Sequence, residues 1–226
     1  MKGLLITTIA IVAAVCVMVG LNAIRPDRET DDEKQAKKET ERMLDAADKL
    51  EDELKTPDTF KVKFECTNGT FVCEFYKDWA PQGVGRMYEL VKSGALDQAR
   101  FFRVVPNFIV QFGIPGDPQV AAKWRSANIP DDPVTHGNAR GTVTFAMAGP
   151  NTRTSQLFIN LVDNARLDSM GFAAIGKVIE GMEVVDAINP EYGELPDQGR
   201  IQRVGNAYLE KEFPRLDYIK SATLEK

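Results

Sequence analysis

The fold can be predicted from residues 60–75, which read FKVKFECTNGTFVCEF. Apolar and polar side chains alternate on both sides of the Asn68-Gly69 dipeptide, which is the period of a β-strand with one buried face. An Asn-Gly dipeptide favours a two-residue hairpin turn of type I′, because that turn needs positive φ angles at both central residues. The stretch therefore predicts two antiparallel strands joined by a tight turn.

The chain has three cysteines, Cys16, Cys66 and Cys73. They are too few for a disulfide scaffold, and their spacing lacks the CxxC pairs that a zinc site needs. With a two-residue turn, Cys66 would face Phe71 across the hairpin and Cys73 would be its diagonal neighbour, which is an awkward geometry for a disulfide. We therefore expect neither a metal site nor a disulfide framework.

The residues after the hairpin predict more short strands and few helices. Residues 80–97 predict a helix that ends at Ser93, and residues 101–112, FFRVVPNFIVQF, predict a strand, a bend and a second strand. Residues 115–140 are rich in turn-forming residues and predict a long exposed loop. Further strands are expected at 141–149, 155–162, 171–179 and 201–210, and a short helix at 180–189. Many short strands with only two helices predict a mainly β fold, a closed barrel rather than alternating βαβ units.

One charged residue, Arg103, interrupts the apolar pattern of residues 101–112. Burying an unpaired charge is so costly that proteins rarely do it. Taken alone, Arg103 is therefore expected at the surface, with its aliphatic stem packed and its guanidinium in water.

Composition and charge exclude several classes of function. The chain has 226 residues, 43% of them hydrophobic, and a net charge of −5 without a basic block, so we expect no nucleic-acid partner. Its one histidine, His136, lies in a turn-rich stretch and is expected to be solvated. A hydrolase using Ser155 or Ser169 with His136 lacks a GxSxG-like turn. Catalysis by a metal that several histidines hold is excluded.

The N-terminal residues predict a membrane anchor. Residues 3–24 carry no charge and are as long as a bilayer-spanning helix, which needs roughly 20 residues. A cleaved signal peptide is the main alternative, but its apolar region is only about 7–15 residues long and ends at a small-x-small site. A lipoprotein signal at Cys16 is less favoured, because the bulky Val15 precedes it. We expect residues 1–24 to be an uncleaved signal anchor.

Residues 25–57 predict a charged helical linker between this anchor and a globular domain. The segment has no aromatic residue and repeats apolar residues at helical spacing over 43–54. A solvated spacer in a monomer is the simpler interpretation, and a stalk-mediated coiled-coil dimer is the alternative, although two heptads are short for one. The Lys and Arg count would leave the domain in the cytoplasm, but large domains behind an anchor often cross. We therefore expect a single-pass membrane protein with its domain on the extracytoplasmic, periplasmic side.

Three segments of the globular part resemble the cyclophilin-type peptidyl-prolyl cis-trans isomerases, of a membrane-anchored, bacterial-like kind. They are FFRVVPNFIVQFGIPGDP, GTVTFAMAGPNTRTSQLFIN and LDSMGFAAIGKVIEGMEVVDAI, and they occur in the family's order and spacing. The resemblance covers residues 59–210 and implies a closed eight-stranded antiparallel barrel capped by two helices. We accordingly expect a cyclophilin-like domain over 58–212 and a C-terminal tail over 213–226.

The resemblance also implies an activity, which is rotation about X-Pro peptide bonds of unfolded or exposed polypeptides without a cofactor. The alternative is a non-catalytic peptide-binding or chaperone module. Arg103 and Gln111 would be catalytic, Arg103 by donating to the substrate's prolyl carbonyl and Gln111 by binding the substrate and holding the arginine. The implied substrate-binding residues form a pocket for the proline ring and a groove for the residue before it: Phe108, Ile109, Phe158, Leu167 and Phe172 for the pocket, and Ala146, Met147, Ala148 and Gln156 for the groove.

The chain departs from the family pattern near this site. Phe102 and Phe172 stand where histidines are common, which implies a more apolar rim. Arg166 stands where some members carry a tryptophan that contacts cyclosporin, which implies weak binding of that ligand. The loop at 115–140 is also unusual in detail, so the resemblance leaves the substrate preference open.

Overall fold

The computed structural model describes residues 35, 37–40, 42–43 and 55–225. The chain divides into two units, Met1–Lys55 and Thr56–Lys226. In the first unit, the described residues between 35 and 43 are helical. The anchor predicted at 3–24 lies outside the described residues. None of the helices in the described part of the chain is both long and apolar enough to cross a membrane.

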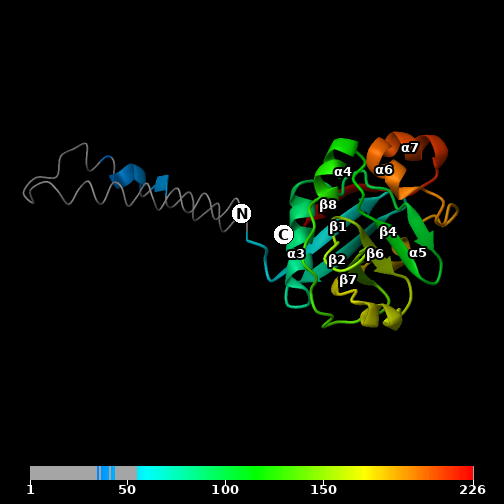
Figure 1. Ribbon diagram of the computed structural model, residues 1–226, viewed down its shortest axis with the longest axis horizontal. Coiled ribbons are helices and arrows are strands. Elements are labelled where there is room, and N and C mark those ends of the chain that lie inside the picture. Colours follow the sequence, from blue (N-terminus) through cyan, green and yellow to red (C-terminus); the bar gives the residue numbers. More distant parts are fainter. Residues whose placement is uncertain (1–34, 36, 41, 44–54, 226) are drawn as a thin grey trace, which may run out of the picture. The chain divides into compact units, whose positions relative to one another are not determined.

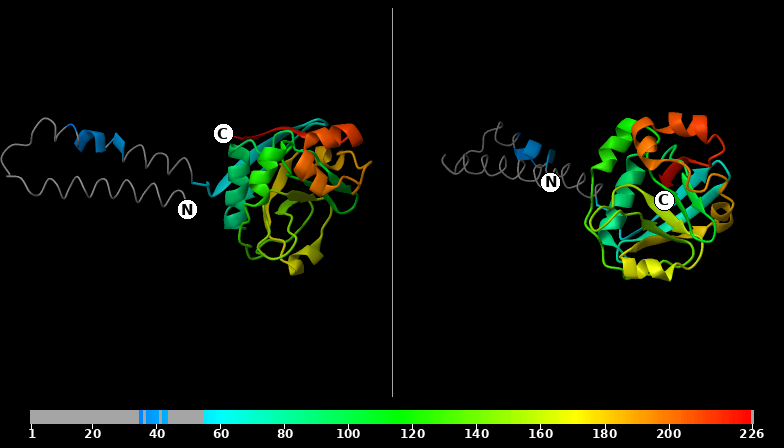
Figure 2. Two further views of the ribbon diagram at one scale, coloured as in Figure 1. Left: turned by 45° about the horizontal axis from the view of Figure 1, so that its top comes forward. Right: turned by 45° about the vertical axis from the view of Figure 1, so that its right-hand side comes forward.

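The second unit is built on one eight-stranded antiparallel sheet. Its strands are β1 (Thr59–Cys66), β2 (Thr70–Tyr76), β3 (Arg103–Val105), β4 (Ile109–Phe112), β5 (Thr142–Phe145), β6 (Leu157–Asn160), β7 (Ala174–Glu180) and β8 (Ile219–Leu224). They lie in the order β3-β4-β6-β5-β7-β2-β1-β8, and the sheet curls into a half-barrel with helices around it (Figures 1 and 2). This corrects the closed barrel expected from the sequence. Strands β3 and β8 remain edges, and an isolated bridge between Arg100 and Tyr218 joins the segments that precede them.

Five α-helices lie between residues 55 and 225, where the sequence predicted two. They are α3 (Pro81–Lys92), α4 (Pro118–Arg125), α5 (Met182–Asp186), α6 (Gln198–Val204) and α7 (Asn206–Glu212). Helices α3 and α5 were predicted, and α3 ends at Lys92 with Ser93 as its C-cap, in agreement with the expected end. Helix α4 lies in the predicted loop, although two start signals precede it. Pro118 is its first residue, and the Asp117 side chain accepts from the N–H of Gln119 at 2.7 Å.

The strand predicted at 201–210 is wrong, because these residues belong to α6 and α7. Ile201 of α6 and Tyr208 and Leu209 of α7 are buried in the smaller core, so the apolar residues of this stretch belong to two short helices separated by Gly205. The eighth strand comes instead from the segment expected to be a tail. Strand β8 pairs antiparallel with β1, and the domain therefore extends past residue 212.

The hairpin of β1 and β2 forms as predicted but in a different register. Phe64 pairs with Phe71, and their rings stack with centroids 4.8 Å apart, whereas the prediction placed Cys66 opposite Phe71. The N–H of Cys66 donates to the Gly69 carbonyl at 2.8 Å, so the two residues between them form the turn. Asn68 has no positive φ, and its side chain donates to a carbonyl of α5 at 2.8 Å. Because the register moves by two residues, the same side chains stay on the buried face.

Cys66 and Cys73 are both buried and free, and in the observed register Cys73 pairs with Val62, four residues before Cys66. Burial, with a smaller contribution from the Asp217 carboxylate, raises the pKa of the Cys66 thiol to about 12. Burial also raises the pKa of Cys73 well above its ordinary value. Both thiols therefore stay protonated at neutral pH and are poor nucleophiles.

Two hydrophobic cores stabilise the domain. The larger lies inside the curl of the sheet, and its fully buried aromatic residues are Phe64, Phe71, Phe75, Phe101, Phe112 and Phe145. The smaller core includes side chains from α4, α6 and α7, and its members are Phe102, Ile114, Ala121, Ile201, Tyr208, Leu209 and Leu216. Phe102 is only 1% exposed, so it does not make the rim of the site more apolar, as the sequence had implied. It is buried because its side chain packs into the smaller core and not toward the groove that Arg103 lines.

Candidate active site

Three neighbouring strands bring residues from distant parts of the chain onto one face of the sheet. Arg103 of β3 lies opposite Gln111 of β4, and Gln111 lies opposite Phe158 of β6. Side chains alternate between the two faces of a strand. These three therefore lie on the outer face, while the neighbouring Val110 and Ile159 belong to the core inside the curl.

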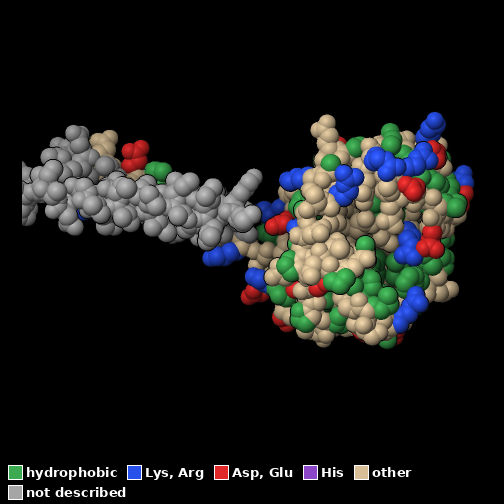
Figure 3. Space-filling view, viewed as in Figure 1, with side chains coloured by type: hydrophobic (Ala, Val, Ile, Leu, Met, Phe, Trp, Pro, Cys, Tyr) green, Lys and Arg blue, Asp and Glu red, His purple; other side chains and the backbone are tan. Residues whose placement is uncertain are grey.

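All eleven residues that the sequence predicted for the site line one groove of about 310 Å³. The groove is bounded by β3, β4, β6, the segment between β5 and β6, and the 3₁₀ helix η1 (Ala165–Met170). Its lining residues are Arg103, Phe108, Ile109, Gln111, Ala146, Met147, Ala148, Thr152, Thr154, Gln156, Phe158, Leu167, Phe172 and Gln198. On the face shown in Figure 3, hydrophobic side chains line a hollow over β4 and β6, with Lys or Arg side chains at its edge.

Three of the lining residues were not predicted, namely Thr152, Thr154 and Gln198. The two threonines lie within the AGPNTRTSQ motif, so a closer interpretation of that motif could have included them. Gln198 begins α6. It could not be found, because the helix that carries it was not recognised in the sequence.

The floor of the groove is apolar. Ile109, Phe158 and Leu167 are buried in a cluster of their own, separate from both cores, and Phe108 and Phe172 pack against it. The rings of Phe158 and Phe172 meet edge to face, with centroids 5.8 Å apart. An apolar ring can therefore pack against this floor without covering a polar side chain of the cluster.

A chain of polar contacts runs along the groove from Glu194 to Gln156. Arg103 Nε and Nη2 both contact Glu194 Oε1, at 2.6 and 2.5 Å. Arg103 Nη1 donates to Gln111 Oε1 at 3.2 Å, and Gln111 Nε2 donates to Gln156 Oε1 at 2.9 Å. The Arg103 side chain is 26% exposed. The charge that seemed out of place in an apolar strand is thus paired and still accessible from the groove.

Glu194 was not predicted from the sequence. It lies in the loop after α5, which is attached to β3 where the N–H of Val104 donates to the Gly193 carbonyl at 3.1 Å. This bond brings Glu194, the residue after Gly193, next to Arg103, although the two are 91 positions apart in the chain. Glu194 does not line the groove itself, so it holds Arg103 from outside. No local sequence pattern indicates such a contact.

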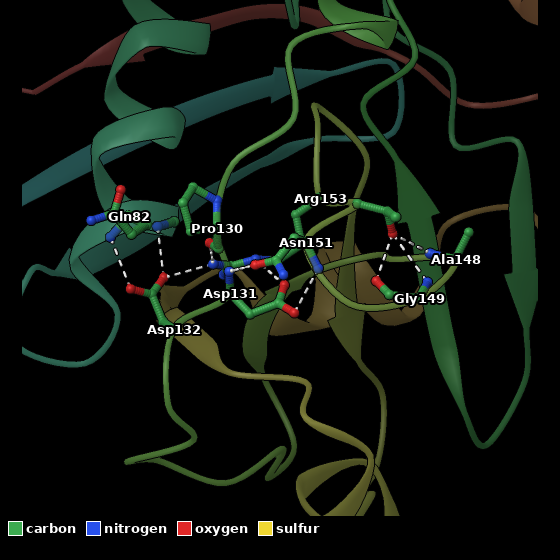
Figure 4. Close-up of polar contacts among 10 residues, drawn as sticks. Gln82, Pro130, Asp131, Asp132, Ala148, Gly149, Asn151 and Arg153 are labelled. Carbon is green, nitrogen blue, oxygen red and sulfur yellow. Dashed lines mark hydrogen bonds and ion pairs between the residues drawn. The ribbon is translucent and has the colours of Figure 1, made fainter.

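The segment of residues 146–156, which we call the rim segment, is fixed by its own hydrogen bonds. The N–H of its first residue donates to the carbonyl of its last residue at 2.9 Å. Within it, the Thr152 hydroxyl accepts from the N–H groups of Ala148 and Gly149 at 2.9 and 3.0 Å (Figure 4). The backbone of the rim segment is thereby held in one shape beside the groove.

A buried group that we call the rim strut, consisting of Arg153, Asp131 and Asp132, ties the rim segment to α3. Arg153 is 2% exposed and contacts Asp132 at 3.0 Å and Asp131 at 3.3 Å, and it also donates to the Pro130 carbonyl (Figure 4). Asp132 in turn accepts from two backbone N–H groups in the first turn of α3, at 3.0 and 2.9 Å. A carboxylate at a helix N-terminus is favoured by the helix dipole. The strut therefore links the groove to the start of a long helix.

The alternative hydrolase arrangement does not form among the described residues. His136 stacks on Trp79 with ring centroids 4.0 Å apart, and its Nδ1 lies 3.1 Å from the Thr135 hydroxyl. Ser155 is buried, and the Ser169 hydroxyl donates to a backbone carbonyl at 2.9 Å. The described His, Cys, Asp and Glu side chains also form no group of three that could hold a metal ion.

Comparisons with known proteins agree with this geometry. The family model described as cyclophilin-type peptidyl-prolyl cis-trans isomerase/CLD matches residues 61–206. The chain is 35% identical over 134 residues to a peptidyl-prolyl cis-trans isomerase of Acinetobacter baylyi, which covers 56% of this chain and 70% of that protein. It is 32% identical over 137 residues to peptidyl-prolyl cis-trans isomerase B of Escherichia coli, covering 56% of this chain and 82% of that protein.

A solved structure shares the fold. It is a cyclophilin-type isomerase of Cryptosporidium parvum crystallised in the presence of the dipeptide Ala-Pro, and it superimposes with a TM-score of 0.56 at 21% identity. The match covers 74% of this chain and 99% of that chain. The fold, the groove and the family match lead to one conclusion, which is that this chain belongs to the cyclophilin-type peptidyl-prolyl cis-trans isomerase family.

Proposed function

We propose that this chain accelerates rotation about X-Pro bonds in unfolded or exposed polypeptides, at a membrane. The observation that carries the proposal is Arg103, which Gln111 and Glu194 hold at the edge of an apolar pocket. Three of the five N–H donors of a guanidinium are used in these contacts, which leaves two for a substrate. Membership of the family supports the same activity.

Arg103 would act on the twisted state through which the bond rotates. In that state the C–N bond loses its partial double-bond character, and the barrier is about 18–20 kcal/mol. The prolyl nitrogen becomes pyramidal and its lone pair localises. A guanidinium that donates to the prolyl carbonyl and towards this nitrogen binds the twisted state more strongly than the planar one. Because catalysis is differential binding, each ~1.4 kcal/mol gained in this way is about tenfold in rate.

The remaining groove residues would position the peptide. We place the proline ring on the floor formed by Ile109, Phe158 and Leu167, and the preceding residues along the rim segment. Apolar walls suit a twisted amide, since it is less polar than a planar one and loses less on leaving water. The presence of Ala-Pro with the related Cryptosporidium parvum protein supports a proline-containing ligand.

The test is a rate measurement on the full chain in detergent, with and without the arginine. We expect Arg103→Ala to lower kcat/KM for a proline peptide by about 100- to 1,000-fold, the loss typical of removing a preorganised donor to a developing charge. The variant should unfold at nearly the wild-type temperature, because the side chain is partly exposed. Equal rates for the two proteins would refute the mechanism.

A non-catalytic peptide-binding module is the second candidate, because the same groove could bind a proline peptide without accelerating its rotation. The free donors of Arg103 favour catalysis, since a pure binder needs only the apolar pocket. The assay distinguishes the two functions. A binding module would shift peptide resonances on titration and leave the cis-trans exchange rate at its uncatalysed value.

We also propose that residues 3–24 anchor the chain and that the domain lies on the extracytoplasmic side. The uncharged length of this segment supports the anchor. The helical residues between 35 and 43 are compatible with a spacer beyond it. Protease added to intact spheroplasts should digest the domain and leave a cytoplasmic control protein whole. Protection of the domain until the membrane is broken would contradict the proposed orientation.

A further inference from the structure

We propose that Arg166 makes the groove prefer peptides that carry an acidic side chain directly after the proline. The inference rests on the proposed function and adds a substrate class to it. It is carried by two arginines that share one aromatic ring at the groove and differ in how their charges are compensated.

The shared ring is that of Phe108. The Arg103 Cζ atom lies 5.9 Å from its centroid, and the Arg166 Cζ atom lies 4.8 Å from it. Phe108 lines the groove. Arg166 is exposed. It directly precedes Leu167, whose side chain is buried in the floor. Arg103 lines the groove itself, and Arg166 stands beside it over a ring that lines the groove.

Only one of the two charges is compensated by a contact in the described part of the chain. Arg103 contacts Glu194 at 2.5 Å. The acidic residues nearest to Arg166 in sequence, Asp163 and Asp168, are engaged elsewhere. Asp163 accepts from the N–H of Arg140 at 2.8 Å.

Asp168 accepts from the backbone N–H and the side-chain amide of Asn138, at 2.8 Å in both cases. No carboxylate within the described residues forms an ion pair with Arg166, which stands over Phe108 as an uncompensated cation. A peptide carboxylate could therefore pair with Arg166 without displacing another contact.

The position of this cation along the groove follows from the ends of β6. At one end, the N–H of Ala146 in the rim segment donates to the Gln156 carbonyl at 2.9 Å. At the other end, the N–H of Leu161 donates to the Phe108 carbonyl at 2.9 Å. A peptide whose residues before the proline follow the rim segment thus leaves the pocket at the end where Phe108 and Arg166 lie. The side chain after the proline is the one that meets Arg166.

The expected effect is modest, because both partners are in contact with water. An exposed ion pair supports a preference of about two- to fivefold at low salt. Salt at about 0.5 M shortens the screening length to a few ångströms and should remove most of the preference. A preference of this size and salt dependence is measurable and would not be expected from a change in fold.

The test uses exchange NMR on the full chain in detergent, which measures cis-trans rates without a cleaving protease. The probes are acetyl-Ala-Ala-Pro-Glu-Ala-amide and the same peptide with Gln in place of Glu. We expect the Glu peptide to have the higher kcat/KM by about two- to fivefold at low salt. A third peptide, with Glu directly before the proline, should show a smaller preference over its own Gln counterpart.

Variants identify the residue responsible. The ratio of kcat/KM for the Glu peptide to kcat/KM for the Gln peptide should fall to about 1 in Arg166→Gln. It should stay above 1 in Arg166→Lys and fall below 1 in Arg166→Glu. The ratio cancels any general change in activity. Lys61→Gln is the matched control, because it removes one positive charge from an exposed position on β1, where no residue lines the groove, and should leave the ratio unchanged.

Two failures can be told apart. Wild-type rates that are equal for the Glu and Gln peptides, or a ratio that Arg166→Gln leaves intact, would overturn the inference while the proposed isomerase stands. If the protein accelerated neither peptide, the proposed isomerase function itself would be refuted. A larger effect for Glu before the proline would overturn the placement of the cation after it.

Discussion

Arg103 and Arg153 both lie at the groove region and both contact carboxylates, but their surroundings are opposite. The Arg103 side chain is 26% exposed and its partner Glu194 is 61% exposed. The Arg153 side chain is 3% exposed and its partner Asp132 is 1% exposed. The first pair presents unused donors to the groove, and the second is enclosed beneath the rim segment.

The difference shows how burial decides what an arginine does. A buried charge must be surrounded by partners, and removing one of them leaves an uncompensated charge out of water. Such a group stabilises a structure but has no donors to offer a substrate. An arginine at the surface is cheaper to leave partly unpaired, and its pairing is also weaker and more easily screened by salt. The buried Arg153 fixes the shape of the rim segment, and the exposed Arg103 keeps donors that, in the proposed function, a substrate would use.

The largest expected effect is on stability, from removing the acid of each pair. Asp132→Ala should lower the free energy of unfolding by about 3–5 kcal/mol, because it leaves Arg153 buried without its main partner. Glu194→Ala, the matched control, should cost at most ~1 kcal/mol. Urea unfolding followed by tryptophan fluorescence measures both. Equal losses for the two variants would contradict the distinction between the pairs.

The next effect comes from replacing arginine by lysine at both positions. Lysine keeps the charge but lacks the planar set of donors that contacts several acceptors at once. We expect Arg103→Lys to lower kcat/KM by about 10- to 100-fold with little change in stability. Arg153→Lys should mainly lower the unfolding temperature. If Arg103→Lys lowered the unfolding temperature as much as Arg153→Lys does, the distinction between the two arginines would be contradicted.

The smallest effect is expected from Glu194→Gln, which keeps an acceptor for Arg103 but removes the charge. Because the pair is exposed, kcat/KM should fall by only about two- to fivefold. The same loss should appear in the wild type when salt is raised to about 0.5 M, and the variant should be insensitive to that change. Exchange rates measured at both salt concentrations test this. A wild type and variant with the same salt dependence would show that the charge of Glu194 has no role.

The eleven site residues could be named in advance because they belong to motifs that stay close together in sequence. FFRVVPNFIVQF places Arg103, Ile109 and Gln111 on two short strands, and alternation then puts them on one face. Phe102 directly precedes Arg103 but packs into the smaller core and not toward the groove. Most of its partners in that core come from segments distant in sequence, so the family pattern alone does not indicate its burial.

The parts that were missed depend on contacts between distant segments or on ambiguous local patterns. The hairpin register changed because Phe64 and Phe71 stack and Asn68 bonds to α5, neither of which the Asn-Gly dipeptide indicates. Residues 201–210 suit either a strand or a helix by their apolar spacing, and packing in the smaller core decides in favour of helices. Strand β8 pairs with β1 across most of the domain's length in sequence.

By itself, the sequence determined the family, the strands β1 to β7 and most of the side chains that face the groove, because these follow from patterns within a few residues of one another. Only the tertiary structure decided which charges are compensated. Glu194 pairs with Arg103 and Asp132 pairs with Arg153. Arg166 lies over Phe108, and no carboxylate of the described residues forms an ion pair with it. The physical reason is that the energy of a charge depends on its burial and on distances between segments, and neither quantity is written in local sequence.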